Sequence, residues 1–313
     1  MPLLFAAFEW SQIAQFLIDG LSYGMLIALI ALGYTMVYGI VELINFAHGD
    51  LFMLGSCLAF TLLGFLVPKG AETYLVVVGL TICLIVVPLF CAGLNLAVDR
   101  IVYRPLRTAP KLAPFVSALG VSFVFMNLGL FWIGSQGEDF PDLLPTDNLL
   151  GKESSVRFTA KDLMVFGVTI PLMLALTYLV KFTKLGKAMR ATAQNPIAAR
   201  LMGIDTDRVI AATFLIGGGL AGFGSVVFGL KINTIHFQMG FQNGLYAFTA
   251  AVLGGIGNIP GAVIGALLIG LIRAFGSAFV GEQWVGAMVF ATLIVILVFR
   301  PQGLLGARVR EKV

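Results

Sequence analysis

The residues best suited to bind another molecule lie in one polar stretch, 187–208, which joins basic side chains to many small ones. It stands between segments that are almost entirely apolar. A membrane protein that builds a helix on the water side usually builds it for a partner, so the stretch predicts a helix over 187–204 that contacts another protein. The alternative is an amphipathic helix that lies at the lipid headgroups.

A second polar cluster interrupts the apolar sequence at 38–50, where Glu42, Asn45, His48 and Asp50 follow one another closely. Polar and ionisable side chains are costly within a membrane and usually face the protein interior or a water-filled path. The cluster therefore predicts part of a translocation path. The alternative is a turn at the cytoplasmic interface, where the ionisable groups meet water. A metal site is not expected, because the second histidine of the chain lies on the predicted opposite side.

Glycines and a proline interrupt another apolar stretch, Gly254-Gly-Ile-Gly-Asn-Ile-Pro-Gly261. This pattern predicts a broken helix at membrane depth, where irregular backbone is tolerated only if it is buried in protein or lines a cavity. The free N–H groups of such a break would attract an anionic group of a solute. The alternative is close helix contact, since Gly257, Gly261 and Gly265 repeat every four residues.

Composition places the whole chain in lipid. Of its 313 residues, 59% are hydrophobic and 12% are charged, against about 25% charged in soluble domains. The formal charge of +4 does not indicate nucleic acid binding, because the bases sit in three blocks between apolar segments. No Gly-x-x-x-x-Gly-Lys-Ser/Thr loop is present, so the chain is not expected to hold nucleotide phosphates. Cys57, Cys83 and Cys91 lie in apolar segments and are expected to be small buried hydrophobes.

Nine apolar segments are candidates for membrane spans, each of which needs about 20 residues. They run over residues 12–38, 51–67, 74–97, 113–134, 162–181, 209–230, 242–256, 259–279 and 283–299. Lys and Arg concentrate around 100–111, 181–208 and 300–312, which predicts these blocks to be cytoplasmic and the acidic loop 135–161 to be outside. Segment 242–256 is short, but an even number of spans must separate the inner Arg208 from Arg300. The sequence predicts an all-α polytopic membrane protein with about eight to nine spans and its N-terminus outside.

Four motifs, in order along nearly the whole chain, resemble those of the branched-chain amino acid ABC-transporter permease family. They are Asn45-Phe-Ala-His-Gly-Asp-Leu-Phe-Met-Leu-Gly55, residues 186–208, Ala250-Ala-Val-Leu-Gly-Gly-Ile-Gly-Asn-Ile-Pro-Gly-Ala262 and Arg300-Pro-Gln-Gly-Leu-Leu-Gly306. The length and the short N-terminus look like those of the smaller permease subunit of such high-affinity import systems. The resemblance implies a single transmembrane domain over 1–313 of the ABC-importer permease type, with broken helices. It also implies a cytoplasmic ATPase-docking loop at about 182–208 and an extracytoplasmic loop at about 135–161.

The resemblance implies roles for individual residues as well. The residues that match the family's cytoplasmic loop, and would form the ATPase-docking helix, are Gly186, Arg190, Ala191, Asn195, Pro196, Ala199 and Gly203. The candidate residues of the translocation path are Asn45, His48, Gly49, Gly254, Gly255, Gly257 and Asn258. Many relatives have Glu where this chain has Asp50, a conservative change that alters no assignment.

The function that the resemblance implies is that of the permease subunit of an ATP-driven importer for branched-chain, neutral aliphatic amino acids in the bacterial inner membrane. Its partners would be a second, related permease, two cytoplasmic ATPase chains and a periplasmic amino-acid-binding protein. The chain would then not be an enzyme and would bind no cofactor itself, because ATP and Mg²⁺ belong to the ATPases. No catalytic or metal-ligating residue is assigned.

Other functions remain open at the level of sequence. The same permease family also serves urea, short amides and other neutral amino acids, and no motif reports the solute. An ion-coupled secondary transporter would need carboxylates within the membrane, and the spans offer Asp19, with Glu42 and Asp50 near a predicted edge. A partner-free channel is disfavoured by the docking-type loop.

Overall fold

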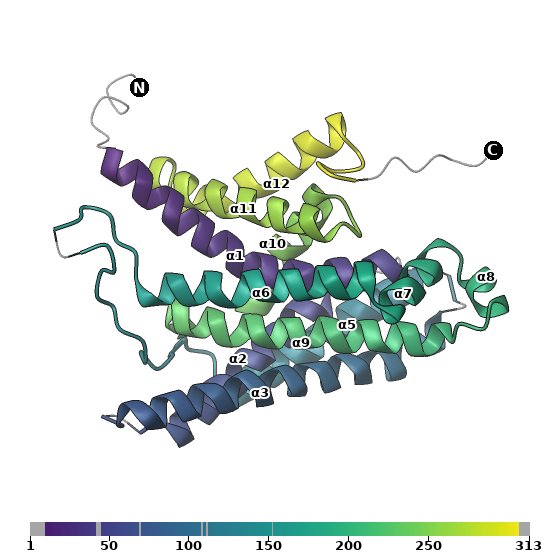
Figure 1. The fold of residues 1–313 in the computed structure, drawn as a ribbon, viewed down its shortest axis with the longest axis horizontal. Helices are drawn as coiled ribbons and strands as arrows, with labels where there is room; N and C mark the ends of the chain where they lie inside the picture. The colour runs from purple at the N-terminus through teal and green to yellow at the C-terminus, as the bar shows by residue number, and fades with distance from the viewer. Residues whose placement is uncertain are drawn as a thin grey trace.

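Figure 1 shows a bundle of long helices in the computed structural model, which describes residues 10–41, 45–68, 70–107, 109–110, 112–151 and 153–306. Glu42 and parts of two basic blocks, including Lys111 and Arg308, lie outside the described residues. The predicted spans correspond to α1 (Trp10–Val41), α2 (Ala47–Leu66), α3 (Thr73–Val98), α5 (Leu112–Ile133), α6 (Ala160–Phe182), α9 (Thr206–Ile232), α10 (Met239–Gly254), α11 (Ile259–Phe279) and α12 (Glu282–Phe299).

The remaining elements are short: the π-helix η1 (Asp99–Tyr103), α4 (Arg104–Leu106), α7 (Lys184–Gln194), α8 (Pro196–Leu201) and the strands β1 (Glu138–Asp139) and β2 (Thr234–Ile235). Among the described residues, eight helices are long and apolar enough to cross a membrane. The prediction of an all-α polytopic membrane protein is therefore confirmed.

The two ends of the bundle differ in their connections (Figure 1). The start of α1 and the long connection between α5 and α6 lie at the left, whereas α7, α8 and the segment after α12 lie at the right. The right-hand end carries the basic residues of η1, α4 and α7, so it is the cytoplasmic end by the positive-inside rule.

Helix α10 has 16 residues and is not among the eight helices of spanning length. Just before it, β2 pairs antiparallel with β1 of the outer connection, with Ile235 opposite Glu138. At its other end, the carbonyl of Gly254 accepts a hydrogen bond of 3.0 Å from the N–H of Leu305, which follows the cytoplasmic Arg300. Residues 233–238 and α10 therefore join the two ends of the bundle, in agreement with the predicted ninth crossing.

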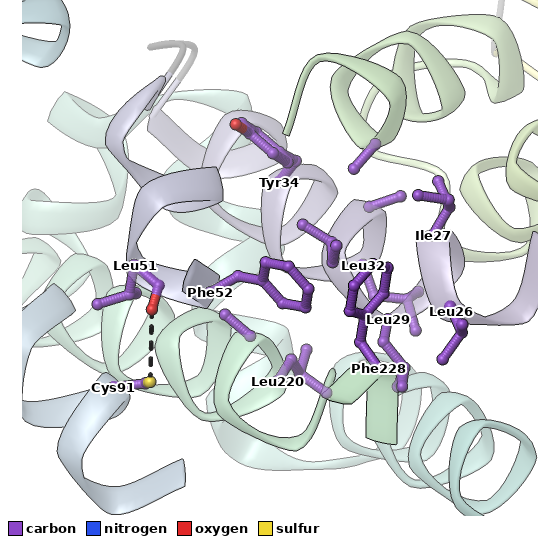
Figure 2. Packing of buried hydrophobic residues seen from close by; sticks show 14 of the residues in the cluster. Leu26, Ile27, Leu29, Leu32, Tyr34, Leu51, Phe52, Cys91, Leu220 and Phe228 are labelled. Atoms are coloured by element: carbon purple, nitrogen blue, oxygen red, sulfur yellow. Dashed lines mark hydrogen bonds between the residues drawn. The ribbon is translucent and has the colours of Figure 1, made fainter. Parts of the chain in front are cut away.

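The core is built around α1, in which residues 26–37 are all buried. Figure 2 shows the leucines of α1 beside Phe52 of α2 and Phe228 of α9, whose ring centroids lie 5.2 Å apart at an interplanar angle of 84°. The thiol of Cys91 donates to the carbonyl of Leu51 at 3.7 Å. All three cysteines are free and buried, as the sequence predicts.

Helix backbones meet at glycines, because apolar side chains gain little from leaving lipid and close van der Waals contact must hold the helices together. At the crossing of α1 and α11, a Cβ on Gly24 would lie 2.8 Å from the Cα of Leu267. A Cβ on Gly270 would collide with the backbone of Gly20. Glycines therefore set the separation between α1 and α11.

Replacement of Gly24 by alanine tests this contact. The added methyl group has no room against Leu267, so we expect Gly24→Ala to lower the melting temperature of the detergent-solubilised protein. Gly64→Ala is the matched control, because a Cβ there would meet nothing within 4 Å and alanine is favoured over glycine in helices by about 1 kcal/mol. Equal melting temperatures for Gly24→Ala and the wild type would contradict the importance of the contact.

Cysteines placed at Asp142 and Lys184 test the orientation. Both positions are exposed, the first in the outer connection between α5 and α6 and the second at the start of α7. We expect Asp142→Cys to react with an impermeant maleimide in intact cells and Lys184→Cys to react only after lysis, since the native cysteines are buried. Labelling of both positions from the same side would overturn the assigned orientation.

Candidate functional site

The predicted docking loop forms two helices, α7 and α8, beyond the cytoplasmic end of the bundle (Figure 1). The single helix expected over 187–204 is interrupted at Asn195, where φ is −159°. The side-chain oxygen of Asn195 accepts hydrogen bonds of 3.0 Å from the N–H groups of Ile197 and Ala198. Pro196 suits the first helical position because it has no N–H to satisfy. Asn195 and Pro196, both exposed, therefore start α8 as a separate helix.

Helix α7 is fixed to the end of α6 by two of the predicted docking residues. The hydroxyl of Thr183 accepts a hydrogen bond of 3.0 Å from the N–H of Gly186, and a Cβ on Gly186 would collide with the carbonyl of Val180. The guanidinium of Arg190 donates to the same carbonyl, which lies in the last turn of α6, where helix carbonyls need partners from outside the helix. Ala191 is half-buried. Gly186 and Arg190 thus hold the loop to its own chain, and their contact with a partner stays a prediction.

Helix α8 presents an apolar face to water. Ile197 is 71% exposed, and Leu201 and Met202 are each 83% exposed. Ala199 is buried against the chain, and Gly203 ends the helix with a φ of +84°, which favours glycine. Large apolar side chains that cluster on a surface mark interaction sites. The sequence prediction includes Ala199 and Gly203 but misses the three exposed side chains. Leu201 and Met202 follow Ile197 by four and five residues, a spacing that places all three on one side of a helix and is visible in the sequence.

A charged network ties the docking loop to the end of α3. The carboxylate of Asp207, in the first turn of α9, lies 3.4 Å from Arg104 and 3.7 Å from Arg200. It also pairs with Arg107, which reaches on to the buried carboxylate of Asp99 at 2.6 Å. Because Arg200 belongs to α8 and Asp99 to η1, one network joins α8, α9 and the end of α3. From the sequence, these arginines predict only the orientation. Their pairing with Asp207 is not predictable from the sequence, because Arg104 and Arg107 are far from Asp207 in the chain.

Asn45 lies in a buried hydrogen-bond chain. The hydroxyl of Tyr103 donates to the side-chain oxygen of Asn45 at 3.1 Å, and the amide of Asn45 donates to Asn95 at 3.2 Å. Asn95 donates in turn to the carbonyl of Phe214 at 2.6 Å. These bonds join the start of α2 to η1, α3 and α9. Asn45 thus bonds within the bundle, and its place on the translocation path stays a prediction.

Helices α2 and α10 begin against each other in the interior. A Cβ on Gly49 would collide with the carbonyl of Gly240, so the first turns of the two helices are in backbone contact. The carboxylate of Asp50 lies in the first turn of α2 and accepts a hydrogen bond from the hydroxyl of Ser122. Helix N-termini favour negative charge. The dipoles of the two N-termini therefore offset part of the cost of burying Asp50, whose other carboxylate oxygen has no hydrogen-bond partner among the described residues.

His48 lies beside this junction, with its ring centroid 4.8 Å from that of Tyr34 and the rings edge to face. Within the described part of the chain, neither ring nitrogen of His48 has a hydrogen-bond partner. His48 and Asp50 are 1% and 0% exposed, so the alternative of an interfacial turn that meets water is wrong for both. Glu42 lies outside the described residues. The contact of His48 and Gly49 with a solute stays a prediction.

The break between α10 and α11 lies at the cytoplasmic end of the bundle. The sequence predicts it at membrane depth, so that part of the prediction is wrong. The C-terminal segment covers it: the N–H of Leu304 donates to Leu253 at 2.7 Å, and the amide of Asn258 donates to the carbonyl of Leu305 at 2.7 Å. The side-chain oxygen of Asn258 also accepts from the N–H of Gly261 at 3.2 Å. Asn258 therefore caps α11 itself, where the sequence predicts N–H groups free for a solute.

The glycines of this break make close backbone contacts. A Cβ on Gly254 would collide with Gly261, and one on Gly255 would lie 2.5 Å from the N of Gly306. The φ angles of Gly255 and Gly257 are +102° and +81°, which other residues rarely adopt. The geometry favours the contact interpretation for Gly254 and Gly255. A place for these residues and the exposed Gly257 on the path stays a prediction.

Asp207→Asn tests the charged network. The substitution removes the anion shared by Arg104, Arg107 and Arg200, so we expect faster hydrogen–deuterium exchange across residues 196–208. Lys187→Gln, an exposed charge change on α7, is the control and should leave this exchange unchanged. Exchange in Asp207→Asn at the wild-type rate would show that the network does not hold the loop.

Comparison with known proteins matches the chain to one family and several relatives. The family described as "Branched-chain amino acid transport system / permease component" matches residues 16–298. The high-affinity branched-chain amino acid transport system permease protein BraD of Pseudomonas aeruginosa is 40% identical over 303 residues, 96% of this chain and 97% of that protein. The corresponding protein LivH of Escherichia coli K12 is 38% identical with the same coverage. The autoinducer 2 import system permease protein LsrC of Yersinia pseudotuberculosis is 30% identical over 165 residues, 51% of this chain and 45% of that protein.

No solved structure matches the chain. The family match nevertheless extends from α1 into α12 and so includes every long helix of the bundle. Together with the eight helices of spanning length in the described part of the chain, it shows a multi-pass protein of the inner membrane. The chain belongs to the family of branched-chain amino acid transport permeases.

Proposed function

We propose that this chain is the permease subunit of an ATP-driven importer that carries branched-chain, neutral aliphatic amino acids into the cell. The names of relatives that share 38% and 40% identity over almost the full length support this solute class. ATP and Mg²⁺ would bind to two cytoplasmic ATPase chains, so this chain moves the solute and catalyses no reaction. A second, related permease would complete the path, and a periplasmic binding protein would deliver the amino acid.

The observation that carries the proposal is the apolar face of α8, formed by Ile197, Leu201 and Met202. Figure 1 places α8 beyond the ends of the long helices. Large apolar side chains in such a position gain most by insertion into a pocket of a partner protein, where water is excluded. The cytoplasmic ATPase is the partner that an importer permease requires at this end.

The Asp207 network supplies the mechanical connection that such a partner needs. Arg200 of α8 and Arg107, beyond η1 and α4, both pair with Asp207 of α9. Helix α9 in turn contacts α1, α2 and α3. A movement imposed on α8 would therefore reach the helices that surround the core. Alternation between outward and inward openings requires this kind of connection.

Leu201→Glu tests the docking role. A carboxylate would lose its hydration in the cleft of the ATPase, so we expect uptake of radiolabelled leucine to fall by on the order of tenfold or more. The amount of ATPase chain that co-purifies with the solubilised permease should fall with it.

Leu201→Met is the matched control, because it keeps an apolar side chain of similar size and should preserve both uptake and co-purification. A helix that lies on lipid headgroups would lose membrane contact in Leu201→Glu and still keep its ATPase. Normal uptake and normal co-purification in Leu201→Glu would contradict the docking role.

A further inference from the structure

A charged cavity of about 250 Å³ opens between the outer parts of α1, α9 and α11. Its walls include Asp19 and Tyr23 of α1, Lys231 of α9 and Arg273 of α11. In Figure 1, α1 and α11 run side by side toward the outer end of the bundle. The sequence prediction notes Asp19 as a carboxylate of the first span but misses its neighbours, because they belong to helices far away in the chain.

Two ionisable groups of this cavity, those of Asp19 and Arg273, lie within the spans, whereas Lys231 is in the last turn of α9. Asp19 is nine residues beyond Trp10, the first residue of α1, which corresponds to about 14 Å along the helix. Arg273 is six residues before Phe279, the last residue of α11, or about 9 Å along that helix. A charge that faces lipid at such a depth is costly, and ionisable residues in spans face protein or water. The cavity therefore belongs to an aqueous or protein-covered surface.

Carboxylates on neighbouring elements hold the two cations of the cavity in place. The Nζ of Lys231 lies 2.6 Å from Asp162 of α6, and a guanidinium nitrogen of Arg273 lies 2.9 Å from Glu282 of α12. The guanidinium of Arg273 also stacks on Tyr23, 4.0 Å from the ring centroid. Lys has three N–H donors and Arg has five, so each cation is positioned and still has donors for a further partner.

Asp19 is the unmatched charge of the cavity. Among the described residues, its carboxylate pairs with no Lys or Arg and accepts one hydrogen bond of 3.0 Å from the amide of Gln15. The side chain is exposed. A carboxylate at this depth is stabilised most by a positive group close to it. The chain itself leaves that position open to a cation from outside.

We propose that this cavity is an outer solute subsite that holds a zwitterionic amino acid, with its ammonium group at Asp19 and its carboxylate at Arg273 and Lys231. The inference rests on the proposed function and adds a binding site to it. Hydrogen bonds between ionised groups are the strongest that side chains make. The apolar wall at Leu26 and Ile232 suits an aliphatic side chain. The volume lies below the range of about 300–1,000 Å³ of pockets for drug-sized ligands, as a single amino acid requires.

Close contact between α1 and α11 closes the cavity on its cytoplasmic side. Gly20, Gly24 and Gly270 bring the two backbones together without space for a side chain. The hydroxyl of Tyr23, which lines the cavity, donates a hydrogen bond of 2.8 Å to Asn243 of α10 and so holds this wall of the cavity in place. A solute held at the subsite can therefore move inward only when α1 and α11 separate.

Asp19→Asn tests the subsite, because it removes the charge and keeps the size of the side chain. In the complete transporter we expect the initial rate of leucine uptake to fall by about tenfold, which corresponds to the loss of one charge-assisted hydrogen bond. The amount of assembled complex should stay unchanged. Asp139→Asn, an exposed carboxylate of the outer connection, is the matched control and should transport at the wild-type rate.

A second measurement reports occupancy of the same cavity. Ile232 lies in its wall and is 40% exposed, so Ile232→Cys should react with an impermeant maleimide in the reconstituted complex. We expect the labelling reaction to be slower with leucine-loaded binding protein than with unloaded binding protein. Full uptake by Asp19→Asn, or labelling that leucine does not slow, would overturn the subsite. Failure of the wild-type complex to take up leucine would instead overturn the proposed function, and the subsite with it.

Discussion

Direct contact between helix backbones at glycines is the constraint on which the rest of the bundle depends. Lipid is as apolar as a leucine side chain, so helices associate where small residues let them approach. Gly24 and Gly270 bring α1 against α11, and Gly49 and Gly240 bring α2 against α10. The second contact places the N-termini of two helices at one point in the interior. The side chain of Asp50 is buried at that point, where the helix dipoles offset part of the cost of its burial.

The hydrogen bonding of the polar side chains is governed by the same lack of water in the membrane. A buried polar group in a membrane protein must find its partner within the protein. Asn45 does so through Tyr103 and Asn95, which join three parts of the chain. Asp19 lies in the outer cavity with an amide partner and no cation among the described residues. The contrast separates side chains that hold the bundle together from the one that we propose binds the ammonium group of a solute.

The long helices are predictable from the sequence because the apolar windows and the basic blocks are local signals. The bounds of α11 agree with the predicted segment 259–279, and the basic residues of η1, α4 and α7 lie together at one end of the bundle. The depth of the break at 254–261 is not predictable in this way. A glycine pattern looks the same at the centre of a bundle and at its end, and contact with the C-terminal segment decides the position. The pairing of Asp207 with Arg104 and the meeting of Asp19 with Arg273 depend likewise on helices that are distant in the chain.

The central claim is that ATP consumed by partner chains drives an amino acid inward through this permease. The most direct measurement is leucine accumulation in proteoliposomes that contain the complete complex, with loaded binding protein on its outer face and ATP on the face of α8. We expect leucine to accumulate against its gradient with ATP and not with a non-hydrolysable analogue. Accumulation that needs no ATP and follows an imposed proton or sodium gradient would contradict the claim.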